Sequence, residues 1–356
     1  MPASPEAGAS PAPGPDLPRE FQTRPLLRRA LQAVGALAIL FAIFLLAPGL
    51  GEVRDLLTEA EPGWLALATA LEALSFACYV LMFGPIFCTG LSRRRSWQIG
   101  GSELAMGSLV PASGAGGLAL GAWILHRGGM DAARIARRSV AFFLIKSAVN
   151  FVAVAVIGTA LAIGILGPEL SLWLTAVPAA AAALTIGAVA LLPRLGPGRT
   201  PDPRASRLSR GWSHTRTAVI NGTTEAFQIV RSGDLRVLAG SFGYWAFDNA
   251  VLWATFRAFG LSPPLTVVLM AYLIGQLGGL LPIPGGIGGI DGGLIGTFIV
   301  YGTAAAGTAA AVLAYRVILF WLPLLLGGLA FASLRRDMPT GNELASCAPA
   351  IAAQSA

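Results

Sequence analysis

Long apolar runs separated by short polar stretches dominate the chain. A helix that crosses a bilayer needs about 20 predominantly apolar residues, because the hydrocarbon core is about 30 Å thick. The pattern therefore predicts an all-α polytopic membrane protein. The runs long enough to form full transmembrane helices are 31–50, 63–87, 139–166, 171–193, 237–259 and 306–334.

Two further apolar segments, 99–126 and 264–302, are interrupted in the middle by proline and glycine. The first break reads Pro111-Ala-Ser-Gly-Ala-Gly-Gly117, and the second reads Pro282-Ile-Pro-Gly-Gly-Ile-Gly-Gly289. Broken backbone at membrane depth is tolerated only where protein or a water-filled cavity covers it. We therefore expect two re-entrant Pro/Gly-broken hairpins beside about six full transmembrane helices, eight apolar segments in all. Eight simple crossings with kinked helices are the alternative.

The arginines indicate the topology, because loops on the cytoplasmic side of a membrane are enriched in Lys and Arg. Arginines 93–95 precede the first broken segment, and four more follow it between 127 and 138. Both groups lie inside only if segment 99–126 enters and leaves from the cytoplasm. By the same rule, segment 264–302 enters and leaves from outside, and the acidic 51–62 loop also lies outside. We expect a multi-pass inner-membrane protein with cytoplasmic N- and C-termini.

This topology divides the membrane domain, residues 30–336, into two units of opposite orientation, at about 63–166 and 237–334. Inverted repeats with broken helices near the midplane are the architecture of many transporters. The linker 194–236 is cytoplasmic, and its mixed stretch 206–236 indicates an interfacial or cytoplasmic helix. The two tails, 1–29 and 337–356, are small and polar, so we expect both to be disordered.

Composition excludes several classes of function. The chain is 55% hydrophobic and 12% charged with a net charge of +7, but the arginines form no basic face with stacking aromatics, so nucleic acid is not an expected partner. No histidine falls within a span, and the three cysteines lack metal-ligand spacing. We expect no metal, no cofactor and no enzymatic activity.

We single out six charged residues within the apolar segments as the intramembrane set. Each costs about 2.5–3.5 kcal/mol at a helix centre, so such residues usually face the protein interior and pair. Two cations and four acids allow two ion pairs and leave acids over, and a spare carboxyl in this setting could carry a proton. Candidates for charge or proton coupling are Asp248, Glu72 and Lys146, although Lys146 could instead extend to the interface. The full set is Glu72, Glu103, Lys146, Asp248, Asp291 and Arg316.

Arg316 is the candidate for holding a phosphate, because arginine binds phosphate bidentately. Asp291 or Asp248 would hold the guanidinium when the site is empty; a permanent structural pair is the alternative. Glycines at the breaks could offer backbone N–H groups to a headgroup or simply allow close helix packing. The remaining candidate substrate-binding residues, all at or near the breaks, are Gln276, Gly285, Gly286, Ser113 and Gly114.

The second break also carries a recognisable motif. Pro282-Ile-Pro-Gly-Gly-Ile-Gly is followed by Asp291, and later by Tyr315-Arg316 and Trp321-Leu-Pro323. This pattern resembles the lysylphosphatidylglycerol synthase transmembrane-region family, also called flippase-like membrane proteins. The resemblance covers about 30–336. It implies the membrane half alone, without an aminoacyl-transferase domain, and a role in moving lipids between leaflets.

The sequence therefore predicts a flippase or transporter for an anionic, phosphate-bearing membrane lipid. A secondary transporter for a small polar solute could use the same hairpins. A membrane scaffold for cell-envelope or lipid-glycosylation enzymes is a further alternative, and such enzymes would then be its partners.

Overall fold

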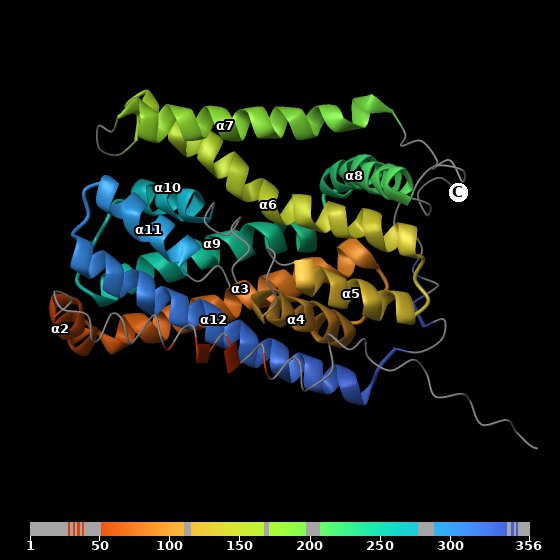
Figure 1. Cartoon of the computed structure of the whole chain (residues 1–356), viewed down its shortest axis with the longest axis horizontal. Helices are drawn as coiled ribbons and strands as arrows, with labels where there is room; N and C mark the ends of the chain where they lie inside the picture. The colour runs from red at the N-terminus through yellow and green to blue at the C-terminus, as the bar shows by residue number, and fades with distance from the viewer. Residues whose placement is uncertain are drawn as a thin grey trace, which may run out of the picture.

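The computed structural model describes residues 51–109, 115–166, 171–196, 207–276 and 288–339, and a few isolated positions on either side of these ranges. Every element in these ranges is helical, which confirms the all-α prediction (Figure 1). Four of the described helices are long and apolar enough to cross a membrane. They are α3 (Pro62–Phe87), α6 (Ala132–Ala162), α7 (Leu172–Leu191) with its 3-10 extension η2 (Leu192–Leu195), and α12 (Ala305–Arg336).

Helix α9 (Leu235–Ala258) is similar in length to α3 but is not among these four. It begins at Asp234, whose carboxylate accepts a 2.9 Å hydrogen bond from the Arg236 backbone N–H. The hydrogen bond from the Arg236 side chain also lowers the pKa of the Asp234 carboxyl. The first predicted span, 31–50, lies almost wholly outside the described residues. The total of eight apolar segments therefore stays a prediction.

One helix ends before each predicted break and another begins after it. Helices α4 (Arg93–Leu109) and α5 (Ala115–Arg127) flank the first, and α10 (Leu265–Gln276) and α11 (Gly289–Val300) flank the second. The two members of each pair pack against each other. In Figure 1 the α4–α5 pair lies toward one end of the molecule, and the α10–α11 pair lies at the opposite end.

One expected loop is a helix. The 51–62 stretch contains α2 (Gly51–Glu59), followed by two linking residues before α3. Leu56 and Leu57 of α2 pack against the apolar cluster that includes Ala68 and Phe256. Asp55 and Glu59 of α2 are exposed, on the side away from these leucines.

The stretch 206–236 contains a helix as expected, α8 (Arg207–Arg231), and its interfacial or cytoplasmic location stays a prediction. It packs on α6, and Figure 1 shows it strongly foreshortened where α6, α7 and α9 run along the length of the molecule. Gly222 allows this crossing, because a Cβ there would lie 2.6 Å from Cβ of Val140 in α6. Helix α8 therefore crosses the bundle direction instead of continuing it.

Arginine-rich segments that are far apart in sequence meet at one end of the molecule. Arg95 pairs with Asp337 at 3.3 Å and with Glu343 at 3.0 Å, and Arg138 donates a 2.9 Å hydrogen bond to the carbonyl of Ile86. A disulfide joins Cys88 to Cys347 at this end. These contacts bring together the ends of α3 and α12 and the starts of α4 and α6.

The opposite end is marked by aromatic side chains. Arg257, in the last turn of α9, lies 5.5 Å from the ring centroid of Trp64 and 5.9 Å from that of Trp253. Trp residues are enriched at membrane–water interfaces, where one side of the ring is apolar and the other is wet. The two ends of the helix bundle therefore differ in charge: one gathers several arginines, and the other holds Arg257 beside two tryptophans.

Candidate functional site

The candidate site is built around the antiparallel pair of helices α3 and α9. The backbone N–H of Glu61, before α3, donates to the carbonyl of Ala258 at the end of α9 (2.9 Å). Near the middle, the Ser75 hydroxyl donates to the carbonyl of Tyr244 (3.2 Å). Closely packed helices in a membrane commonly meet at small residues. The contact therefore brings polar groups of both helices to the centre of the bundle.

Two acidic residues lie at this centre. Asp248 of α9 is 5% exposed and Glu72 of α3 is 3% exposed, and the two carboxyls are close enough to interact electrostatically. Asp248 accepts hydrogen bonds from the hydroxyls of Tyr272 in α10 and Tyr315 in α12, the latter at 3.0 Å. Among the described residues, none donates a hydrogen bond to Oε2 of Glu72. Glu72 and Asp248 are thus neighbouring buried carboxyls.

Arg316 of α12 and Asp291 of α11 form a buried ion pair. Arg316 Nε lies 2.6 Å from Asp291 Oδ1, and each residue is 5% exposed. The other oxygen of Asp291 accepts a 2.7 Å hydrogen bond from the backbone N–H of Gly288. Gly288 has φ of +87°, a conformation that glycine adopts without steric cost. Asp291 therefore fixes the start of α11 with one oxygen and Arg316 with the other.

The other half of the molecule holds a second polar cluster. Glu103 of α4 is 3% exposed and accepts a 2.9 Å hydrogen bond from the Tyr79 hydroxyl of α3. The Lys146 ammonium of α6 lies 5.7 Å from the Tyr79 ring centroid and 6.0 Å from that of Phe143. These side chains line a cavity of about 110 Å³ together with Ser108. Lys146 is thus partnered within the bundle by an acid and two aromatic rings.

The two clusters share a common sequence spacing. The hydrogen-bonded pairs Tyr79–Glu103 and Tyr272–Asp248 are both 24 residues apart. Asp248 and Tyr315 are 67 residues apart, and so are Tyr79 and Lys146. Ser75 hydrogen-bonds Tyr244, which follows it by 169 residues. Adding 169 to Tyr79, Glu103 and Lys146 gives Asp248, Tyr272 and Tyr315. In the first half the tyrosine (Tyr79) lies on α3 and the acid (Glu103) on α4. In the second half the acid (Asp248) lies on α9 and the tyrosine (Tyr272) on α10.

The structure brings some predicted site residues together and leaves others apart. Arg316 and Asp291 are paired, with Asp248 and Glu72 next to each other nearby on α9 and α3. Lys146 belongs to the other cluster, with Glu103. Gln276 is the last residue of α10. Four predicted residues lie outside the described residues: Ser113, Gly114, Gly285 and Gly286.

Three tyrosines of the site were not predicted as site residues. Tyr79, Tyr272 and Tyr315 each hydrogen-bond a buried carboxylate. A tyrosine within an apolar run contributes to hydropathy like any other large side chain, so the pattern alone does not mark it. The recurrence of polar positions at a spacing of 169 residues is the signal that could have found them.

Comparison with known proteins places the chain in a family. The profile described as "Lysylphosphatidylglycerol synthase TM region" matches residues 32–327. A protein of Methanothermobacter thermautotrophicus described as "UPF0104 membrane protein" is 25% identical over 320 residues, which cover 82% of this chain and 91% of the relative. A second protein of the same organism and description is 27% identical over 322 residues, covering 83% and 90%. The chain belongs to the lysylphosphatidylglycerol synthase transmembrane-region family.

Proposed function

We propose that this protein moves an anionic, phosphate-bearing lipid between the two leaflets of the membrane. The observation that carries the proposal is the buried pair of Arg316 and Asp291, at 2.6 Å. Arginine is the side chain best suited to bind a phosphate with two parallel hydrogen bonds. In this mechanism Asp291 holds the guanidinium in the empty state, and the lipid phosphate competes for it on binding.

We propose further that residues 63–166 and 237–334 are inverted repeats, each containing a re-entrant hairpin. Three observations support this arrangement: α3 and α9 are antiparallel, the α4–α5 and α10–α11 pairs lie at opposite ends of the molecule, and equivalent polar contacts recur at a spacing of 169. Ser75 and Tyr244, which differ by that same spacing, touch each other, as expected close to a two-fold axis. Such repeats allow a site near the midplane to open alternately to each side.

Glu72 and Asp248 are the proposed proton carriers. Two neighbouring carboxyls in a low-dielectric setting repel each other when both are charged, so they favour sharing a proton. Asp248 is also within electrostatic range of Arg316. Displacement of Arg316 toward a lipid phosphate would change the charge that Asp248 experiences and thereby couple lipid binding to proton binding.

The remaining parts of the proposal concern location. The arginine-rich end, which includes Arg95 and Arg138, would face the cytoplasm with both termini, in the inner membrane of the cell. The protein would act without a catalytic step of its own, and its partners would be anionic lipids and the cell-envelope enzymes that make or use them.

A transport assay tests the lipid proposal. The purified protein is reconstituted into vesicles that contain a fluorescent phosphatidylglycerol, and dithionite quenching from outside measures exchange between leaflets. We expect Arg316→Ala and Asp291→Ala to abolish exchange while the proteins still insert, whereas Arg216→Ala, which removes an exposed arginine of α8, keeps the parent rate. Exchange at the parent rate in both site variants would remove the proposed site.

One observation favours a small solute as the second candidate. The cavity lined by Lys146, Glu103 and Ser108 holds about 110 Å³, which suits a small polar molecule better than a lipid headgroup with its glycerol. Vesicles that accumulate no labelled lipid in the inner leaflet but take up a small anion, with Lys146→Ala abolishing that uptake, would favour the solute transporter.

A further inference from the structure

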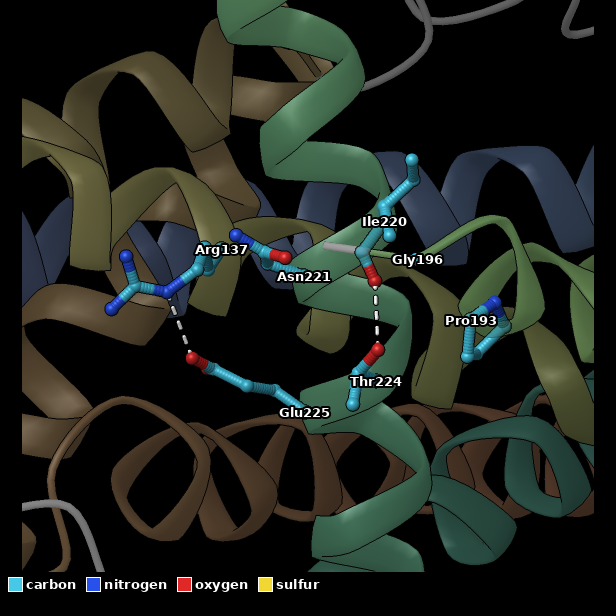
Figure 2. Close-up of a pocket in the computed structure, with 7 residues that line it drawn as sticks. All are labelled: Arg137, Pro193, Gly196, Ile220, Asn221, Thr224 and Glu225. Carbon is cyan, nitrogen blue, oxygen red and sulfur yellow. Dashed lines mark hydrogen bonds and ion pairs between the residues drawn. The ribbon is translucent and has the colours of Figure 1, made fainter. Parts of the chain in front are cut away.

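A second cavity, lined by apolar surface and a few polar side chains, lies at the arginine-rich end, away from the buried ion pair of α11 and α12. Its volume is about 380 Å³, and it lies between α8, α6 and the end of η2 (Figure 2). Helix α8 supplies one wall, and Pro193 faces it from η2. The residues that line it are Arg137, Pro193, Gly196, Ile220, Asn221, Thr224 and Glu225.

The charge around this cavity is positive. Both carboxylate oxygens of Glu225 are held by arginine, Oε1 by Arg137 Nε at 2.9 Å and Oε2 by Arg138 Nε at 2.8 Å. Arg134 is also within electrostatic range of this group. Three arginines thus surround Glu225, and even with Asp131, the N-cap of α6, the positive charges outnumber the acids. An anion is the complementary ligand.

Arg137 can reach a ligand without leaving its partner. Its Nε donates to Glu225, and among the described residues no hydrogen bond involves its two Nη groups. The Arg137 side chain is 32% exposed, against 6% for Arg138. The Nη groups of Arg137 are therefore available donors, and Arg137 lines the cavity together with Asn221 (Figure 2).

The surroundings of the cavity indicate the membrane surface. Leu191 and Leu195, at the end of α7 and in η2, are 51% and 62% exposed, so an apolar surface leads up to the rim. Trp212 of α8 is 73% exposed, and tryptophan is enriched where hydrocarbon meets the headgroups. A site with apolar surface on one side and arginine on the other matches the shape of a phospholipid.

We propose that this cavity binds the headgroup of an anionic phospholipid, with Arg137 donating to the phosphate and an acyl chain lying along the exposed side of α7. Basic pockets between membrane helices on the cytoplasmic side bind anionic headgroups in this manner. This lipid is a resident one, separate from any lipid transported at Arg316, so the proposal holds whether or not the transport proposal does.

Native mass spectrometry of the whole protein in neutral detergent tests the site. The probes are short-chain phosphatidylglycerol, phosphatidylcholine of the same chain length, and inorganic phosphate. We expect the parent to bind phosphatidylglycerol more tightly than phosphatidylcholine, and Arg137→Gln to weaken that binding about tenfold or more, as expected for lost hydrogen bonds to a charged group. The matched control Arg231→Gln removes the same charge from the exposed end of α8 and should keep the parent affinity.

Two further variants keep the result unambiguous. Asn221→Trp narrows the cavity without touching the Glu225 ion pairs and should weaken phosphatidylglycerol binding as well. Arg316→Ala should leave binding at this cavity unchanged, which separates the two lipid sites. Equal affinity for the two lipids, or equal effects of Arg137→Gln and Arg231→Gln, would overturn the proposal. Full competition by inorganic phosphate would show that the cavity takes the free ion and not a lipid.

Discussion

At the scale of the residue, the contribution of the Arg316–Asp291 pair to the free energy of unfolding depends on its burial. Both side chains are less than a tenth exposed and are joined by one short contact between Nε and Oδ1. Removing one partner of such a pair leaves an uncompensated charge away from water, whereas replacing both by apolar groups of similar size is often neutral. A variant with both residues replaced can therefore stay stable, and its transport activity then shows whether the pair also has a functional role.

We therefore predict that Asp291→Ala lowers the free energy of unfolding by about 3–5 kcal/mol. The double variant Arg316→Met, Asp291→Leu should recover most of that loss and still fail to transport lipid. Thermal unfolding in detergent measures the first effect, and the vesicle assay the second. The control Arg94→Ala, which removes an exposed arginine from its surface pair with Asp337, should cost less than about 1 kcal/mol. A double variant that transports normally would assign the pair a purely structural role.

Sequence alone predicted the charged residues of the site better than their surroundings. Charge within an apolar run is visible in any hydropathy profile, so Glu72, Asp248, Asp291 and Arg316 could all be named. Their partners could not be assigned, because pairing depends on which helices are neighbours. Lys146 illustrates this: its acid is Glu103 of α4, which becomes a neighbour only when α4, α3 and α6 pack together.

At the scale of the element, close contact between α3 and α9 depends on glycine. A Cβ placed on Gly240 would lie 2.7 Å from Met82 Cβ and 2.9 Å from the carbonyl oxygen of Cys78, both in α3. Because part of that obstacle is backbone, the two helices would have to move apart to admit a larger residue. The polar contacts farther along the pair, such as Ser75 to Tyr244, depend on the same spacing.

We predict that Gly240→Ala lowers the free energy of unfolding by about 1–3 kcal/mol, the usual cost of overpacking. Gly187→Ala in α7 is the matched control, since a Cβ there meets no atom within 4 Å. It should not lower stability and is expected to raise it by up to about 1 kcal/mol, because alanine is a better helix former than glycine. Thermal unfolding of both variants in the same detergent provides the comparison. Equal stability of the two would mean that α3 and α9 separate without cost.

Helix boundaries were predictable where hydropathy changes abruptly. The span 63–87 differs from α3 by one residue at its start, because Pro62 begins a helix that is apolar throughout. The span 139–166 missed the first two turns of α6, because Arg134, Arg137 and Arg138 lower the local hydropathy. Those turns are helical all the same: Asp131 caps the helix, accepting the Arg134 backbone N–H at 2.9 Å.

At the scale of the whole molecule, the arrangement of the two broken segments decides between the proposed topology and simple crossings. Ser262 precedes α10 and Ala304 follows α11, and both are exposed. If the α10–α11 pair enters and leaves the membrane on one side, these two residues lie on the same face. If the segment crosses the membrane, they lie on opposite faces.

We predict that Ser262→Cys and Ala304→Cys both react in intact cells with a maleimide that cannot cross the membrane. Ser232→Cys, exposed between α8 and α9 at the arginine-rich end, should react only after the cells are permeabilised. The native cysteines are first replaced by serine, so that each variant carries a single thiol. Reaction of Ser262→Cys and Ala304→Cys from opposite faces would rule out the re-entrant hairpin, because only a crossing segment separates its two ends. Reaction of all three from outside would contradict the assignment of the arginine-rich end to the cytoplasm, since the positive-inside rule ties short basic loops to that face.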